Sequence, residues 1–185
     1  VLVGALTAIL AANSAMKIKT PLARNTKKDF VMLQVGKQGV WDLQAAQDRM
    51  FRLEKDRVNG WKRCLNLSMY ELIYCAESMQ SWAASETVGQ VRVVVSNEDT
   101  YITRKTTPTE SASNLGKDGS WIRVKIKEAA AKNKALFVIL EKEGFANFRM
   151  VRSIAGEHGL QLGWEPWNTG EPIHFGGGGR NMNVQ

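Results

Sequence analysis

The sequence predicts a mixed α/β fold, in which a soluble α+β domain with hairpins and a C-terminal βαβ unit follows a single N-terminal transmembrane helix. Three observations support this fold class. Residues 1–16 contain no charged side chain. Short runs rich in β-branched residues alternate with turn residues, which is typical of paired strands. Longer segments repeat apolar residues at a spacing of three to four, which indicates amphipathic helices.

The uncharged segment at residues 1–16 is short for a complete membrane span, which needs about 20 apolar residues. A helix that is apolar on every face lies in lipid or deep inside a large protein. We therefore predict a transmembrane helix, with part of the span preceding Val1. A retained signal peptide and a buried soluble helix are the alternatives.

The overall composition is that of a globular protein, with 44% hydrophobic and 23% charged residues among 185. The net charge is +7, and five basic residues gather in a linker that we place at residues 17–29. Such a collar is typical of a segment that faces anionic lipid headgroups. A nucleic-acid arm is the alternative, but no nucleic acid is expected as a partner. The basic residues are Lys17, Lys19, Arg24, Lys27 and Lys28.

The soluble domain, which we place at residues 30–175, opens with a predicted hairpin. Residues 30–35 are almost continuously apolar, as expected of a strand that is covered on both faces. A four-residue turn from Gly36 to Gly39 leads to a second strand at residues 40–43.

Two helices are predicted next. The first occupies residues 44–58 and ends at the Asn59-Gly60 pair, which is a common stop signal. The second begins at Ser68, because Ser68 and Glu71 have the spacing of a capping box. The predicted inner face of the second helix consists of Leu72, Ile73, Ala76, Met79 and Ala83.

In the middle of the domain, the sequence predicts a second hairpin and a third helix. Strands at residues 91–95 and 101–104 are joined by a polar turn. Residues 106–120 are rich in Ser, Thr and Gly, and they predict a loop. Residues 122–132 predict a helix.

A βαβ unit closes the domain. Residues 135–140 predict a buried strand, and residues 160–164 predict a second strand parallel to it. Asn147 is expected to cap the helix between them, and Gly159 is expected to end that helix. A short strand and a glycine-rich tail at residues 176–185 follow. The apolar face of the helix consists of Phe148, Val151, Ile154 and Ala155.

The sequence gives little support to catalysis, and we predict that the protein is not an enzyme. No nucleotide-binding, hydrolase or metalloprotease motif is present, and no cofactor or metal is expected. Eleven residues of continuous helix would separate Cys64 from Cys75 by about 16 Å, so both are predicted to be free thiols. The turn that contains Trp164, Glu165 and Trp167 is the candidate interaction surface.

The order of elements resembles that of the ExbD/TolR family of biopolymer-transport proteins, relatives of the flagellar stator protein MotB in their membrane part. Two stretches carry the resemblance. One is FVMLQVGKQGVWDLQ, and the other is ALFVILEKEGFANFRMVRSIAGEHGLQLGWEPW. The second stretch is similar to the closing βαβ unit of the extracytoplasmic domain of that family.

The resemblance implies a subunit of a proton-driven motor, anchored in the inner (cytoplasmic) membrane as a homodimer inside a ring of multi-span channel subunits like ExbB, TolQ or MotA. The soluble domain would be periplasmic and would reach a cargo protein or the cell wall. The proton-carrying Asp of the family has no counterpart in residues 1–16, so it is expected upstream of Val1.

Two other function classes remain open. One is a membrane-tethered scaffold or binding domain without energy coupling, and the other is a pilin-like structural subunit. The basic collar departs from the family layout, because the positive-inside rule would place the soluble domain in the cytoplasm. Free thiols would favour the same reducing compartment.

Overall fold

The computed structural model describes residues 24–25, 28–175 and 183–184, which form a mixed α+β structure with two main sheets and four helices. The predicted transmembrane helix at residues 1–16 lies outside the described residues. So do most of the linker at residues 17–29 and most of the tail at residues 176–185. Within the described part of the chain, no helix is both long and apolar enough to cross a membrane.

A five-stranded sheet has the strand order β7-β3-β2-β8-β9. Strand β2 (Phe30–Gly36) is antiparallel to β3 (Gly39–Asp42) and parallel to β8 (Ala135–Glu141). Strand β9 (Leu162–Trp167) is parallel to β8, while β7 (Glu110–Ser111) pairs with β3. The predicted first hairpin and the parallel βαβ unit are therefore confirmed.

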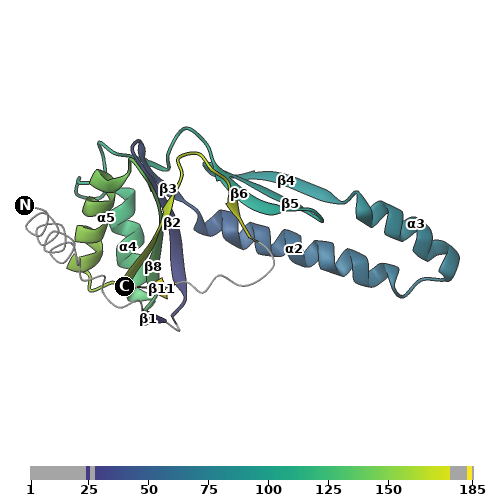
Figure 1. The fold of residues 1–185 in the computed structure, drawn as a ribbon. Helices are drawn as coiled ribbons and strands as arrows, with labels where there is room; N and C mark the ends of the chain where they lie inside the picture. Colours follow the sequence, from purple (N-terminus) through teal and green to yellow (C-terminus); the bar gives the residue numbers. More distant parts are fainter. Residues whose placement is uncertain (1–23, 26–27, 176–182, 185) are drawn as a thin grey trace, which may run out of the picture.

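Helices α4 (Trp121–Ala131) and α5 (Phe145–Glu157) cover one face of this sheet (Figure 1). The predicted apolar face of α5 is confirmed, because its four residues are all buried in this core. The predicted loop at residues 106–120 is also largely irregular, and its buried Glu110 accepts hydrogen bonds from the backbone N–H groups of Trp121 and Ile122, each at 2.9 Å. This carboxylate satisfies donors at the start of α4 that have no partner within the helix.

Asn147 does not cap α5, which begins two residues earlier at Phe145. The Asn147 side chain instead donates from Nδ2 to the carbonyls of Gly36, at 2.7 Å, and Lys37, at 3.0 Å. It thereby binds the β2–β3 turn to the helix. Gly159 follows the end of α5 with a φ of 61°, in the left-handed conformation that was expected of a helix stop.

Helix α2 (Gln44–Cys64) and a second sheet cover the opposite face of the five-stranded sheet. The second sheet is antiparallel, with the order β10-β6-β5-β4. The predicted second hairpin is confirmed as β5 and β6. The strands are β4 (Ala83–Val88), β5 (Val91–Ser96), β6 (Thr100–Arg104) and β10 (Ile173–His174).

Helix α2 runs six residues beyond its predicted end at Val58, through the Asn59-Gly60 pair. Gly60 is buried, and a Cβ at this position would lie 2.7 Å from the Met79 side chain. The glycine therefore permits close approach of α3 (Met69–Gln80) and does not end the helix. The predicted capping box of Ser68 and Glu71 is present at the start of α3.

The predicted inner face of α3 is partly wrong. Met79 is buried there, but Ile73 is 54% exposed. Ala83 belongs to β4, a strand that the sequence pattern does not predict because the helical spacing continues into it. The segment from Trp164 to Trp167 is part of β9 and not a turn.

Figure 1 shows two parts of different shape, which we call the base and the arm. The base is the five-stranded sheet with α4 and α5. The arm consists of α2, α3 and the four-stranded sheet, and it projects to one side of the base. A 21-residue helix such as α2 is about 30 Å long. A small pair, β1 (Arg24–Asn25) with β11 (Asn183–Val184), completes the described elements.

Candidate interaction surface

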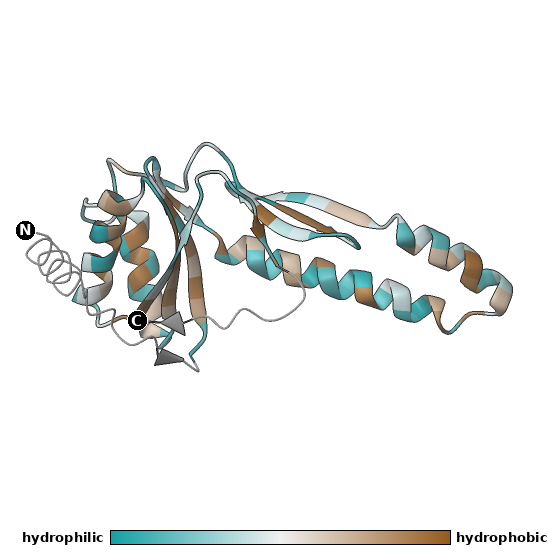
Figure 2. Ribbon diagram, in the orientation of Figure 1, coloured by the Kyte–Doolittle hydropathy of each residue, from teal (hydrophilic) through white to brown (hydrophobic). Residues whose placement is uncertain are grey.

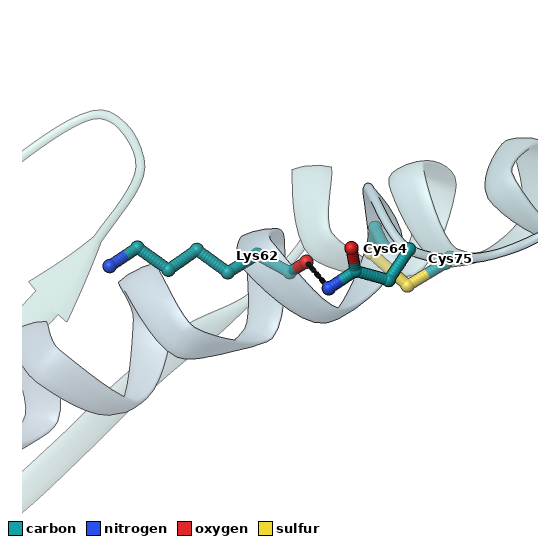
Figure 3. The surroundings of a disulfide bond; sticks show 4 residues. Lys62, Cys64 and Cys75 are labelled. Atoms are coloured by element: carbon teal, nitrogen blue, oxygen red, sulfur yellow. Dashed lines mark hydrogen bonds between the residues drawn. A yellow bond between two sulfur atoms is a disulfide. The ribbon is translucent and has the colours of Figure 1, made fainter.

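A disulfide between Cys64 and Cys75 closes the far end of the arm (Figure 3). The prediction of free thiols is therefore wrong. It assumed one continuous helix, whereas the chain turns back at residues 65–68, so the two cysteines lie on neighbouring helices with their Cα atoms 5.5 Å apart. This Cα separation falls within the range that a disulfide requires.

Beyond the disulfide, the arm ends in six exposed apolar or aromatic side chains. Met69 is 81% exposed, Leu65 is 74% exposed and Tyr70 is 71% exposed. In Figure 2, brown hydrophobic segments lie among hydrophilic ones in α3, at the far end of the arm. We call this set the tip surface: Leu65, Leu67, Met69, Tyr70, Ile73 and Tyr74.

The tip surface follows from the sequence of α3, which is apolar on more than one side. Met79 is the only buried residue of this helix, and Leu72, Cys75 and Ala76 are partly buried. The remaining apolar positions face solvent. A helix that is apolar almost all round normally has a partner on each face. This breadth is the one sequence signal of the surface, and it does not show which apolar positions are exposed.

Local contacts hold the tip surface in one shape. The Tyr70 and Tyr74 rings meet edge to face with their centroids 5.3 Å apart, and their hydroxyl oxygens are 3.2 Å apart. The hydrogen bond with Tyr70 raises the pKa of Tyr74. The Ser68 hydroxyl donates to Glu71 over 2.6 Å, and hydrogen bonding from Ser68 lowers the pKa of the Glu71 carboxyl.

The arm is braced by polar contacts behind the tip surface. Asn97 donates from Nδ2 to the Met79 carbonyl at 2.5 Å, and its Oδ1 accepts from Arg57 at 3.1 Å and from Trp61 at 3.2 Å. This one side chain therefore joins α2, α3 and the turn after β5.

A buried ion pair joins the arm to the base. Glu141, at the end of β8, is 1% exposed and accepts a 2.8 Å hydrogen bond from Gln34. Arg104, at the end of β6, donates from Nε and Nη2 to the two carboxylate oxygens and lies 4.1 Å above the Trp41 ring. Because the two charges satisfy each other, this cluster fixes the two sheets together and presents no free acid or base.

The residues of the sequence-predicted surface are divided between the two faces of the sheet. Trp164 packs against the core under α5, with its ring 5.7 Å from that of Phe148. Trp167 packs against the opposite core and donates from Nε1 to the Glu171 carbonyl at 2.9 Å. Glu165 lies between them and is partly buried. The structure therefore does not bring the two indole rings together.

No group of three or more potential metal ligands occurs in the described ranges of the chain. Comparison of the chain with protein-family models, with curated proteins and with solved structures found no match. The tip surface of the arm is thus the feature on which a functional interpretation can be built.

Proposed function

We propose that this protein is a non-catalytic binding subunit, tethered to a membrane by residues 1–16, that docks a partner protein on the tip surface of its arm. The single observation that carries this proposal is the cluster of six exposed apolar side chains beyond the disulfide. Contiguous exposed apolar surface on a soluble domain marks an interaction site, because leaving it in water is unfavourable.

The composition and rigidity of the tip surface suit a protein partner. Tyrosine is enriched among the residues that dominate binding energy, since it combines a large ring with a polar hydroxyl. The disulfide and the Ser68–Glu71 cap fix α3 before any partner arrives. Preorganisation of this kind lowers the entropic cost of association.

Site-specific photocrosslinking in the source cells tests this proposal. A photoreactive residue at Ile73, on the tip surface, should form a defined adduct, whereas one at the exposed Glu77 of the same helix should not. Adding Tyr70→Ser should reduce the Ile73 adduct at least about fivefold, because loss of a central aromatic contact costs more than about 1 kcal/mol. The unfolding temperature should change little, since Tyr70 is exposed and its contacts with Tyr74 lie at the surface. Equal adducts from both positions would refute the proposal.

A second candidate function is a subunit of a proton-driven, energy-transducing complex. The disulfide favours it, because stable disulfides form in oxidising compartments outside the cytoplasm. An extracytoplasmic domain after an N-terminal span is the layout implied by the resemblance to the ExbD/TolR family. In this function, the arm would transmit movement from the membrane to a cargo protein or the cell wall.

Purification from source membranes in mild detergent separates the two candidates. The motor candidate predicts a complex with multi-span channel subunits, and it also predicts an Asp upstream of Val1 within the apolar segment. Recovery of the chain without any multi-span protein would rule out the motor candidate and leave the tethered binding subunit.

A further inference from the structure

A second apolar feature lies along the exposed side of α2, between the base and the tip surface. Phe51 is 57% exposed, Val58 is 41% exposed and Leu65 is 74% exposed. These residues recur at intervals of seven, so Phe51 and Val58 lie nearly above one another on α2. Leu65, the residue that follows the end of α2, continues the spacing. We call Phe51, Val58 and Leu65 the α2 stripe. It shares Leu65 with the tip surface and extends toward the base.

A seven-residue repeat is the pattern by which one helix packs along another. If the α2 stripe occupies the first position of each heptad, Trp61 falls at a second seam position and is partly exposed. Glu54 falls at the equivalent position of the preceding heptad. Its carboxylate already accepts hydrogen bonds from Arg57, at 2.8 Å, and from Thr100, at 2.5 Å.

The charges beside the α2 stripe indicate what the partner helix carries. Lys55 and Lys62 occupy the flanking position of successive heptads, and both side chains are exposed. Asp48 holds the same position one heptad earlier and accepts a hydrogen bond from Gln44 at 3.0 Å. Figure 3 shows the Lys62 side chain extending along α2, away from the disulfide. No ion-pair partner for either lysine occurs among the residues described by the structure. Carboxylates at the matching positions of a docked helix would complement them.

The same charges disfavour a second copy of this chain as the occupant. An antiparallel pair would place Lys55 of one copy opposite Lys62 of the other. A parallel pair would place Arg57 opposite Lys62. Like charges facing each other across such a seam are destabilising.

We propose that the α2 stripe binds an acidic amphipathic helix of another protein, with its apolar residues over Phe51 and Val58 and its carboxylates beside Lys55 and Lys62. This site goes beyond the proposed function, because Phe51, Val58, Lys55 and Lys62 lie outside the tip surface and because the inference specifies the chemistry of the bound segment. In this mode of recognition, an amphipathic helix binds through its apolar face.

Peptide binding to the purified full chain in detergent tests this inference. The probe is a labelled peptide of three heptads with Leu at both seam positions and Glu at both flanking positions. The comparison peptide has Lys in place of Glu. Fluorescence anisotropy should show binding of the Glu peptide that weakens as salt increases, and binding of the Lys peptide at least about tenfold weaker.

Three variants make the outcome specific. Phe51→Ser with Val58→Ser should weaken Glu-peptide binding at least about tenfold. Lys55→Glu with Lys62→Glu should reverse the preference toward the Lys peptide. The matched control, Lys127→Glu with Lys132→Glu, makes the same charge change on exposed residues of the base, and it should leave the preference unaltered.

The tip variant Tyr70→Ser separates this inference from the proposed function, because it should leave peptide binding intact even if it abolishes crosslinking. Three results would overturn the inference: equal binding of both peptides, binding unaffected by Phe51→Ser with Val58→Ser, or reversal by the control on the base. Self-association through the stripe, detected by sedimentation and lost in the same serine variant, would assign the surface to a second copy. Lysine-dependent binding to anionic vesicles without peptide binding would assign it to lipid.

Discussion

Two carboxylates at the surface of the arm, Glu71 and the partly buried Glu86, form contacts in the folded chain that depend on their charge. Glu71 accepts from the hydroxyl and backbone N–H of Ser68, and these hydrogen bonds lower its pKa below the usual 4.5. Glu86 accepts two 2.6 Å hydrogen bonds from Arg49, and the side-chain hydrogen bond is the largest cause of its lowered pKa. The Ser68–Glu71 contact caps the start of α3, and the Arg49–Glu86 contact joins α2 to β4.

These two residues predict a loss of arm stability in acid. A carboxyl group whose folded pKa is depressed stabilises the fold above its unfolded pKa of about 4.5, and this contribution disappears as the pH falls through the folded value. Glu71→Gln with Glu86→Gln should therefore be less stable than the wild type at neutral pH and should show a shallower decline below about pH 4.5. Urea unfolding at a series of pH values measures both effects.

Glu77→Gln is the matched control for this prediction, because Glu77 is an exposed carboxylate on α3. Its acid decline should follow the wild type. If the unfolding free energy of the double variant declines with falling pH as steeply as that of the wild type, the two hydrogen-bonded carboxylates do not cause the loss of stability in acid.

At the scale of elements, sequence patterns predicted the burial of helices and strands that pack within the base. The strands at residues 30–36 and 135–141 are buried on both faces, and their nearly continuous apolar runs predicted this directly. The amphipathic spacing of α5 likewise predicted its buried face. Each of these elements packs against neighbours in the base.

The arm was harder to predict, because its contacts depend on how α2 and α3 meet. Gly60 appeared to be a helix stop, but its missing side chain makes room for Met79. The helical spacing of Ile73 fits an inner face, but that residue lies at the tip of an arm that has no core on its outer side. The disulfide was missed for the same reason, since only the turn between the helices brings Cys64 close to Cys75.

The candidate site shows the same limit. Trp164 and Trp167 were grouped because they are close in the chain, but strand geometry sends side chains three residues apart to opposite faces. The tip surface could not be recognised from hydrophobicity alone, because exposed and buried apolar positions in α3 have the same composition. Only the position of α3 at the far end of the arm distinguishes them.

At the scale of the whole molecule, burial is unevenly distributed. One core lies between the five-stranded sheet and the helices α4 and α5, and the other lies between that sheet, the first half of α2 and the second sheet. The second core ends near Leu53, well before the tip. Helix α3 thus has one buried residue of its own. It is attached by the disulfide, by the contact of Met79 with Gly60 and by the Asn97 hydrogen bonds. Regions with few buried apolar contacts open first.

This distribution predicts that removing the disulfide loosens the arm but leaves the base intact. The bond closes a short loop, for which chain entropy gives a stabilisation of about 3 kcal/mol. In Cys64→Ser with Cys75→Ser, amide hydrogen exchange in α3 should therefore accelerate by up to about a hundredfold, since 1.4 kcal/mol corresponds to a factor of ten. Exchange in β8 and α5 should remain at the wild-type rate. Reductant should reproduce the effect in the wild type and have no effect on the double variant, which serves as its control. Equal acceleration in β8 would show that the arm and the base unfold as one cooperative unit, and unchanged exchange in α3 would show that the helix keeps its place without the bond.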